Sequence, residues 1–170
     1  MTVWDLSLGR YVATFRAHLH EVSCLSLSKD RNTLFSASVA NEMKLWVASK
    51  GECLFTLEGH LDTISCAAFL SGDAKVLSGS YDSTVRVWST ATGTCLHTLA
   101  DHKKKVLTAA VSPDERYFGT TSEDRTVKLW DASSLTCLHT FVRDEVSQCV
   151  AFSPCSTLLL SCTRSLPDVT

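Results

Sequence analysis

Serine, histidine and aspartate recur along this chain, and these are the residue types that a hydrolytic triad uses. Each residue stands 42 positions from its counterpart, and the set comprises His18, His60 and His102; Ser38, Ser80 and Ser122; and Asp82 and Asp124. A catalytic site needs one such constellation, whereas this chain repeats it at equivalent positions. The repetition predicts a structural role, and we expect no catalytic residue and no enzyme.

Metal chemistry has little support in the sequence. His18, His20 and Cys24 are the one group that suggests zinc ligands, but His18 already belongs to the periodic series. None of the eight cysteines forms a Cys-x-x-Cys pair, and the chain has neither a nucleophile elbow nor a phosphate-binding loop. Most cysteines follow the same period, so we expect them to be small buried hydrophobic residues. No metal and no cofactor is expected.

The elements that position these residues follow from the tryptophans. The four tryptophans, Trp4, Trp46, Trp88 and Trp130, are each separated by 42 residues. The best-preserved copy is the stretch Ser-Gly-Ser-Tyr-Asp-Ser-Thr-Val-Arg-Val-Trp at 78–88, and it returns at 121–130. A period of this length is typical of an array of one repeated supersecondary unit.

Each unit is predicted to hold four short strands joined by tight turns. Apolar runs at 22–27, 64–69 and 106–111 are expected to be strands buried on both faces. A polar turn, a second strand such as 117–121 and the tryptophan strand follow. A turn at Gly9, Gly51 or Gly93, with Leu135 at this position in the fourth copy, leads to the last strand, as at 53–57, 95–99 and 137–141. Helical periodicity is absent, so the sequence predicts an all-β fold of four-stranded antiparallel sheets.

These units resemble the WD-repeat family of β-propellers. The likeness rests on Gly59-His60 at the start of a unit, Ser80-x-Asp82 in its middle, and a final tryptophan that Asp follows in Trp4-Asp5 and Trp130-Asp131. The resemblance implies that histidine, hydroxyl, aspartate and tryptophan brace each blade through hydrogen bonds. The implied sets are His60, Ser80, Asp82 and Trp88; His102, Ser122, Asp124 and Trp130; and His18, Ser38 and Trp46. The third set has Ala40 in place of Asp, and Asn41 only partly replaces the acid.

The expected organisation is a WD-repeat β-propeller over residues 1–162 and a divergent tail over 163–170. Within it we expect a partial unit at 1–16, whole repeats at about 17–58, 59–100 and 101–142, and a partial unit at 143–162. The last unit has Arg143-Asp144 where a histidine is due. This is about four blades' worth of chain, and the family usually resembles a seven-bladed ring. We therefore expect an open arc, as in a fragment or shortened form of a longer propeller; the alternative is that the ends meet in a composite fourth blade.

The charge and composition narrow the class of partner. A net charge of −2 argues against general attraction to nucleic acid or anionic membrane, apart from the local run at 103–105. No apolar run is long enough to span a bilayer and no signal sequence is present, so an intracellular protein, cytoplasmic or nuclear, is expected. Open strand edges also allow self-association.

The resemblance implies an interaction scaffold that docks protein or peptide partners through turns and loops. The candidate contact residues are Tyr81, Glu123, Arg125, Asp62, Lys104 and Lys105. The alternative interpretation of each is an ordinary solvated turn residue. Two other functions remain open: the recognition or sensor part of a larger enzyme, such as an NTPase or ubiquitin ligase, and a truncated form with little activity.

Overall fold

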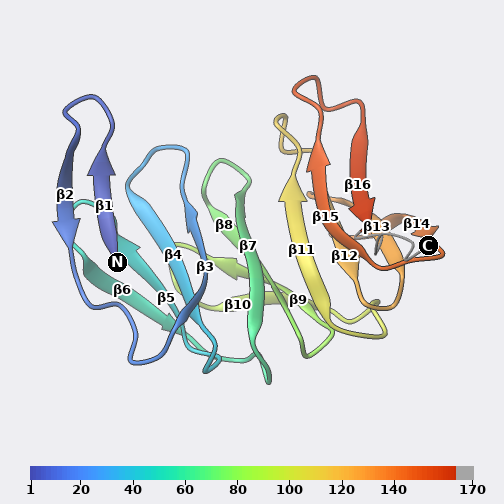
Figure 1. Ribbon diagram of the computed structural model, residues 1–170, viewed down its shortest axis with the longest axis horizontal. Coiled ribbons are helices and arrows are strands. Elements are labelled where there is room, and N and C mark those ends of the chain that lie inside the picture. The colour runs from blue at the N-terminus through green and yellow to red at the C-terminus, as the bar shows by residue number, and fades with distance from the viewer. Residues whose placement is uncertain (164–170) are drawn as a thin grey trace, which may run out of the picture.

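The computed structural model describes residues 1–163, and these residues form strands and turns without a helix (Figure 1). No segment of this range is a helix long and apolar enough to cross a membrane. The strands are β1 (Thr2–Asp5), β2 (Arg10–Thr14), β3 (Val22–Leu27), β4 (Thr33–Ser38), β5 (Met43–Val47), β6 (Glu52–Leu57), β7 (Ile64–Leu70), β8 (Lys75–Ser80), β9 (Val85–Ser89), β10 (Cys95–Leu99), β11 (Val106–Val111), β12 (Tyr117–Ser122), β13 (Thr126–Asp131), β14 (Cys137–Val142), β15 (Ser147–Phe152) and β16 (Leu159–Thr163).

The strands form three four-stranded antiparallel sheets and two two-stranded ones. The complete sheets, β3–β6, β7–β10 and β11–β14, are called blades 1, 2 and 3 here. The pair β1–β2 is the N-terminal half-blade and the pair β15–β16 is the C-terminal half-blade. Within every sheet the order follows the sequence, so each connection is a hairpin. The predicted all-β fold of four-stranded antiparallel sheets is confirmed.

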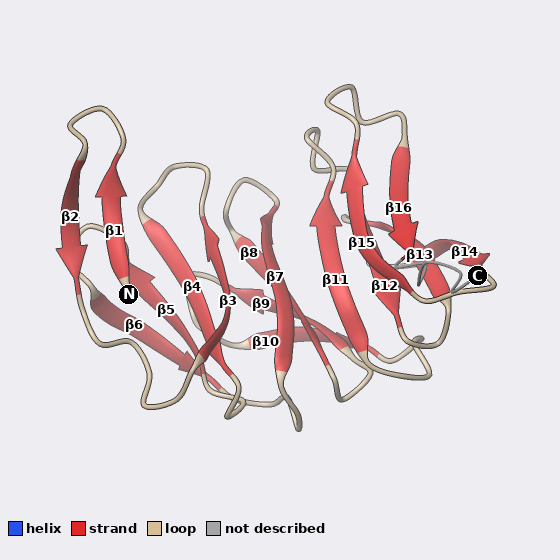
Figure 2. Ribbon diagram, viewed as in Figure 1, coloured by secondary structure: helices blue, strands red, loops and turns tan. Residues whose placement is uncertain are grey.

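The sheets stand side by side in an open arc (Figure 2). Their first strands are neighbours, since β3 packs against β7, β7 against β11, and β11 against β15. The two half-blades lie at opposite ends of the arc (Figure 1). The expected open arc is therefore observed, and the composite fourth blade does not form within one copy. Of the predicted divergent tail at 163–170, Thr163 ends β16 and the rest lies outside the described residues.

The prediction that the apolar runs form strands buried on both faces was wrong. The apolar run at 64–69 becomes β7, which is only partly buried, whereas every residue of β8 after Lys75 is buried. The first strand is an edge strand with a hydrogen-bonded neighbour on one side only. The second strand lies between two strands of its own sheet and between two sheets, which covers it on all sides.

The hydrophobic core lies between the blades rather than inside one of them. Trp88 of blade 2 packs in one cluster with Phe35 of blade 1 and Ile64 of its own blade. Trp130 of blade 3 packs in a second cluster with Leu77 of blade 2. A four-stranded sheet has no interior of its own, so each blade buries its apolar faces only against its neighbours.

The cysteines only partly behave as predicted. Cys66 is buried and Cys24 partly so, but Cys53 and Cys95 are exposed. The exposed pair lies on the outermost strands, β6 and β10, at the edge of each blade. A shared period therefore identifies equivalent positions without showing that they are buried.

The predicted glycine turns have the expected backbone. Gly51 and Gly93 each have a φ of +69°, and Leu135, which replaces the glycine in blade 3, has a φ of +58°. A Cβ on Gly51 would overlap the Phe15 ring. Glycine thus provides both the left-handed turn and the space for a neighbouring blade.

Gly79→Ala should destabilise the contact between blades 2 and 3. A Cβ at this position would lie 2.6 Å from Cys66 Sγ and 2.7 Å from Val106 Cγ1, both on buried residues. We expect the free energy of unfolding, measured by chemical denaturation, to fall by about 1–3 kcal/mol. Gly119→Ala is the matched control, because its closest contact is the end of the partly exposed Leu159 side chain at 2.9 Å. Equal losses for the two variants would contradict this account.

Candidate functional site

Blade 2 holds a chain of hydrogen bonds that joins four of its segments. His60, in the loop before β7, places Nδ1 2.7 Å from Asp82 Oδ2 and Nε2 2.8 Å from Ser78 Oγ. Trp88 on β9 donates its indole N–H to the same Ser78 oxygen at 2.8 Å. Loop, second strand, turn and third strand are thus linked by one network.

Blade 3 repeats this geometry with threonine as the hydroxyl. His102 Nδ1 lies 3.0 Å from Asp124 Oδ2, and its Nε2 lies 2.8 Å from Thr120 Oγ1. Trp130 donates to Thr120 Oγ1 at 2.9 Å. Replacement of serine by threonine leaves the link intact because only the hydroxyl is used.

The protonation state of this network follows from its partners. An ionised Asp82 only accepts, so His60 Nδ1 carries the proton that it donates, and Nε2 accepts from Ser78. Burial lowers the pKa of His60 below its ordinary value of 6.5, with the Asp82 hydrogen bond offsetting part of the effect. Burial also opposes ionisation of Asp82, but hydrogen bonds from Thr84 and the Leu61 N–H outweigh it and lower the pKa of Asp82 to about 2. The stable state is a neutral imidazole beside a carboxylate.

The hydroxyls predicted for the brace, Ser80, Ser122 and Ser38, are not the ones that bind histidine. That role belongs to the residues two positions earlier, Ser78, Thr120 and Ser36. Side chains two positions apart on a strand share a face, so the sequence spacing did not separate the two candidates. Ser80 Oγ lies nearer the turn, where it donates to the Asp62 carbonyl at 2.9 Å and accepts from the Asp82 N–H at 3.1 Å.

Blade 1 has a complete network despite the missing aspartate. Glu42 Oε2 lies 2.7 Å from His18 Nδ1, and Ser36 Oγ receives the Trp46 N–H at 2.8 Å. Glu42 stands two residues after Ala40, and its longer side chain spans the additional distance. The predicted partial substitute, Asn41, instead occupies the turn with a φ of +62°.

The arrangement does not suit catalysis. Ser78 is fully buried and the His60 side chain is completely inaccessible. A nucleophile must reach its substrate, and this hydroxyl has no open side. Residues 1–163 contain no group of three or more His, Cys, Asp or Glu side chains placed to hold a metal ion.

The same carboxylates hold the loop that follows each histidine. Asp82 accepts from the Leu61 N–H at 3.0 Å, and Asp124 accepts from the Lys103 N–H at 2.9 Å. These loops lie at the same end of the blades as the turns after the second strands. The turn residue Tyr81 donates its N–H to Thr63 O at 2.9 Å.

All six predicted contact residues belong to this end of the blades. The structure brings two of them into direct contact across blades, since Lys105 Nζ lies 4.6 Å from the centre of the Tyr81 ring. Glu123 donates its N–H to the Lys105 carbonyl at 2.9 Å. The other three, Asp62, Lys104 and Arg125, are exposed in the adjoining loops and turns.

Sequence reasoning missed two apolar residues at this end. Leu19 and Leu61 directly follow His18 and His60 and are among the most exposed large hydrophobic side chains. Their position could have predicted their exposure, because a residue directly after a buried loop histidine points its side chain outward.

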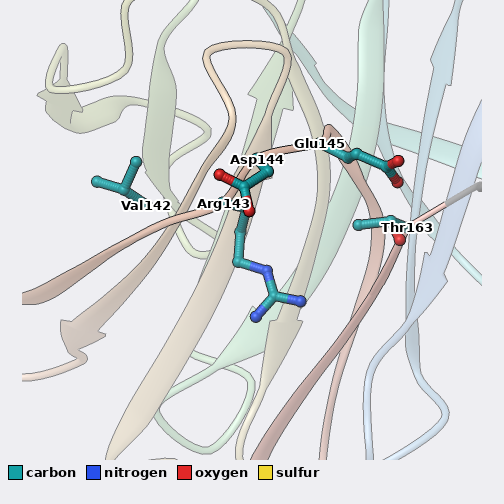
Figure 3. Close-up of a pocket in the computed structure, with 5 residues that line it drawn as sticks. All are labelled: Val142, Arg143, Asp144, Glu145 and Thr163. Carbon is teal, nitrogen blue, oxygen red and sulfur yellow. The ribbon is translucent and has the colours of Figure 1, made fainter.

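A hollow of about 390 Å³ lies where the C-terminal half-blade lacks a histidine, and Val142, Arg143, Asp144, Glu145 and Thr163 line it (Figure 3). Arg143 and Glu145 point in different directions there. The hollow has no convergent set of polar groups, so we assign it no ligand.

Asp82→Ala tests whether the network supports the fold. It removes the acceptor for the His60 Nδ1–H, the Leu61 N–H and Thr84. We expect the free energy of unfolding to fall by about 3 kcal/mol in thermal or denaturant unfolding. Asp101→Ala is the control, because this exposed carboxylate makes no hydrogen bond with the described residues; its change should stay within about 0.5 kcal/mol. A stable Asp82→Ala variant would argue against the network.

The free energy of unfolding should also fall in two steps as the pH is lowered. His60 and His102 have a lower pKa in the folded chain than their ordinary 6.5, so the unfolded chain binds more protons as the pH drops below about 7. The loss should reach at most about 1.4 kcal/mol per pH unit for each histidine. The carboxyls of Asp82 and Asp124, with a pKa of about 2 against 3.8, add a second loss below about pH 4.

Denaturant unfolding from pH 8 to pH 3 measures both steps. His60→Gln should reduce the first step. It should leave the part of the second step that comes from Asp124 in blade 3. An unfolding free energy that rises between pH 7 and pH 5.5 would show that the imidazoles are not held neutral.

Comparison with protein families agrees with this geometry. The family described as WD domain, G-beta repeat matches at residues 9–46, 51–89 and 93–131, together well over half of the chain. Each match contains the second strand, turn and tryptophan strand of one blade. No curated protein matches the chain significantly. The matched repeats, the four-stranded blades and the recurring network together show that this chain belongs to the WD40-repeat family.

Proposed function

We propose that this chain is a non-catalytic docking protein that binds a protein or peptide partner at the end of the blades formed by the histidine loops and the turns after the second strands. This surface is called the loop end here. WD40 repeats generally mediate interactions between proteins, and the proposal gives that role a location. The observation that carries it is the contact of Lys105 from blade 3 with the Tyr81 ring of blade 2.

The contact shows that the loop end is continuous across blades. Thr63 of blade 2 donates its hydroxyl to the Val39 carbonyl of blade 1 at 3.2 Å. Asp82 and Asp124 hold the loops themselves in place by accepting hydrogen bonds from the backbone N–H groups of Leu61 and Lys103. Rigidly held loops bind with a smaller loss of conformational entropy, which suits a docking surface.

The side chains of the loop end indicate the chemistry of the partner. Lys103, Lys104, Lys105 and Arg125 are exposed at blade 3, and Leu61 is exposed at blade 2. A segment with acidic side chains beside an apolar one fits this arrangement. The eight cysteines are free thiols, which agrees with a protein of the cell interior.

Selection from a displayed peptide library, with residues 1–170 as the bait, tests the proposal. We expect peptides with acidic and apolar residues, and Tyr81→Ala should weaken their binding at least tenfold, roughly the effect of a hot-spot residue. Lys105→Ala should weaken binding less and reduce its salt dependence.

The matched control is Tyr117→Ala. Tyr117 lies at the opposite end of blade 3 and has a similar cation, Arg116, 5.5 Å from its ring centre. If Tyr117→Ala abolished binding and Tyr81→Ala did not, the docking surface would lie at the end of the blades opposite the loop end, and the proposal would fail.

A further inference from the structure

The two half-blades contain complementary parts of one blade. Trp4 on β1 precedes Trp46 on β5 by one period, so β1 and β2 correspond to third and fourth strands. At the other end, Ser147 pairs with Thr163 as Val106 pairs with Ser122 in blade 3, so β15 and β16 correspond to first and second strands. Strands β15, β16, β1 and β2, in that order, would make one four-stranded blade.

The edges that would meet in this blade are unpaired among the described strands. β1 pairs with β2 and β16 with β15, and each has a free edge where complete blades join their second and third strands. Neither edge has the proline or lysine that commonly protects exposed edges, since β1 reads Thr-Val-Trp-Asp and β16 reads Leu-Leu-Ser-Cys-Thr. Such edges favour pairing with another strand.

The tryptophan–hydroxyl pair of the network is divided between the two half-blades. Trp4 is 62% exposed, whereas Trp46, Trp88 and Trp130 are at most 5% exposed. At the other end of the chain, Ser161 occupies the position of Thr120, which accepts the Trp130 N–H in blade 3. Each half-blade therefore holds one member of a pair that the complete blades join.

The register of blade 3 shows how the halves would align. There Phe118 faces Trp130 and Gly119 faces Leu129. The same register places Leu159 of one copy opposite Trp4 of another, and Leu160 opposite Val3. The Trp4 indole would then lie beside the Ser161 hydroxyl.

The first strand of blade 1 lacks a neighbour as well. Val22, Leu25 and Leu27 on β3 are exposed, whereas Ile64 and Val106, the counterparts of Val22, are fully buried. β7 and β11 each pack between two other first strands, and β3 packs only against β7 among the first strands described. In a joined assembly β15 of a second copy would take the vacant place beside β3.

We propose that two copies of this chain join head to tail and close into an eight-bladed ring. Residues 1–163 of one copy form sixteen strands, which is four blades' worth, and the half-blades lie at opposite ends of the arc (Figure 1). One copy therefore cannot join its own halves, whereas two copies complete two blades at once. Eight blades lie within the range of known propellers, and a head-to-tail interface that closes after two copies leaves neither β1 nor β16 unpaired in either copy.

The first test is the molecular mass in solution, by light scattering or sedimentation equilibrium over a concentration series. We expect a species of twice the 18.6 kDa of one copy. A monomer throughout the series would overturn the proposal. A ladder of higher masses would also overturn it, because the contacts would then not close.

Charges introduced on the two edges, singly and together, test where the interface lies. Leu160→Glu and Val3→Lys each place an unpaired charge on one edge, and we expect each to convert the dimer to a monomer. Leu160 is exposed and Val3 is partly exposed, so the fold of the single copy should survive. The double variant should restore the dimer, because the introduced lysine of one copy would face the introduced glutamate of the other as a cross-strand ion pair.

Leu138→Glu is the matched control, since Leu138 is a similarly exposed leucine on the outer strand β14. It should leave the mass unchanged. A dimer that persists in both single variants, or that Leu138→Glu disrupts, would show that the copies associate elsewhere and would overturn the ring.

Discussion

The fold depends on a buried polar network whose members are satisfied only together. In blade 2 the indole of Trp88 donates to Ser78, and Ser78 in turn donates to His60. His60 then donates to the Asp82 carboxylate. A buried group without a partner costs about 1–3 kcal/mol, so the loss of one member also penalises the next. The network therefore fixes the loop, the turn and two strands relative to one another.

This network is coupled to the packing between blades. The Trp88 N–H belongs to the network, while its ring packs with Phe35 of blade 1. The Trp130 N–H likewise reaches Thr120 of its own blade, while its ring packs in one cluster with Leu77 of blade 2. A blade is thus well formed when it has its own four segments and a neighbour against its tryptophan. Trp4 has neither a hydroxyl partner nor such cover among the described residues, and it is the exposed tryptophan.

The sequence predicted the parts of this structure that repeat. The 42-residue period identified equivalent positions, and alternation located the strands, because both signals come from the local chain. Neither signal separates Ser78 from Ser80, since both carry a hydroxyl on the same face of the strand. Only the position of the Trp88 N–H, which donates to Ser78, distinguishes them. Glu42 was missed for a related reason: a longer side chain two residues away replaces Asp, and this depends on distance in space. The solvation of Cys53 and Cys95 likewise depends on which strand forms the outer edge.

The network also determines where recognition can occur. Asp82 and Asp124 hold the residues after the histidines by their backbone N–H groups, which leaves the Leu61 and Lys103 side chains free to face outward. Structural and exposed roles therefore alternate along the loop. In a two-copy ring both loop ends would face the same side, because a two-fold axis through the ring preserves that direction. A partner with two binding segments would then engage both copies, and the second contact would benefit from the effective concentration that the first creates.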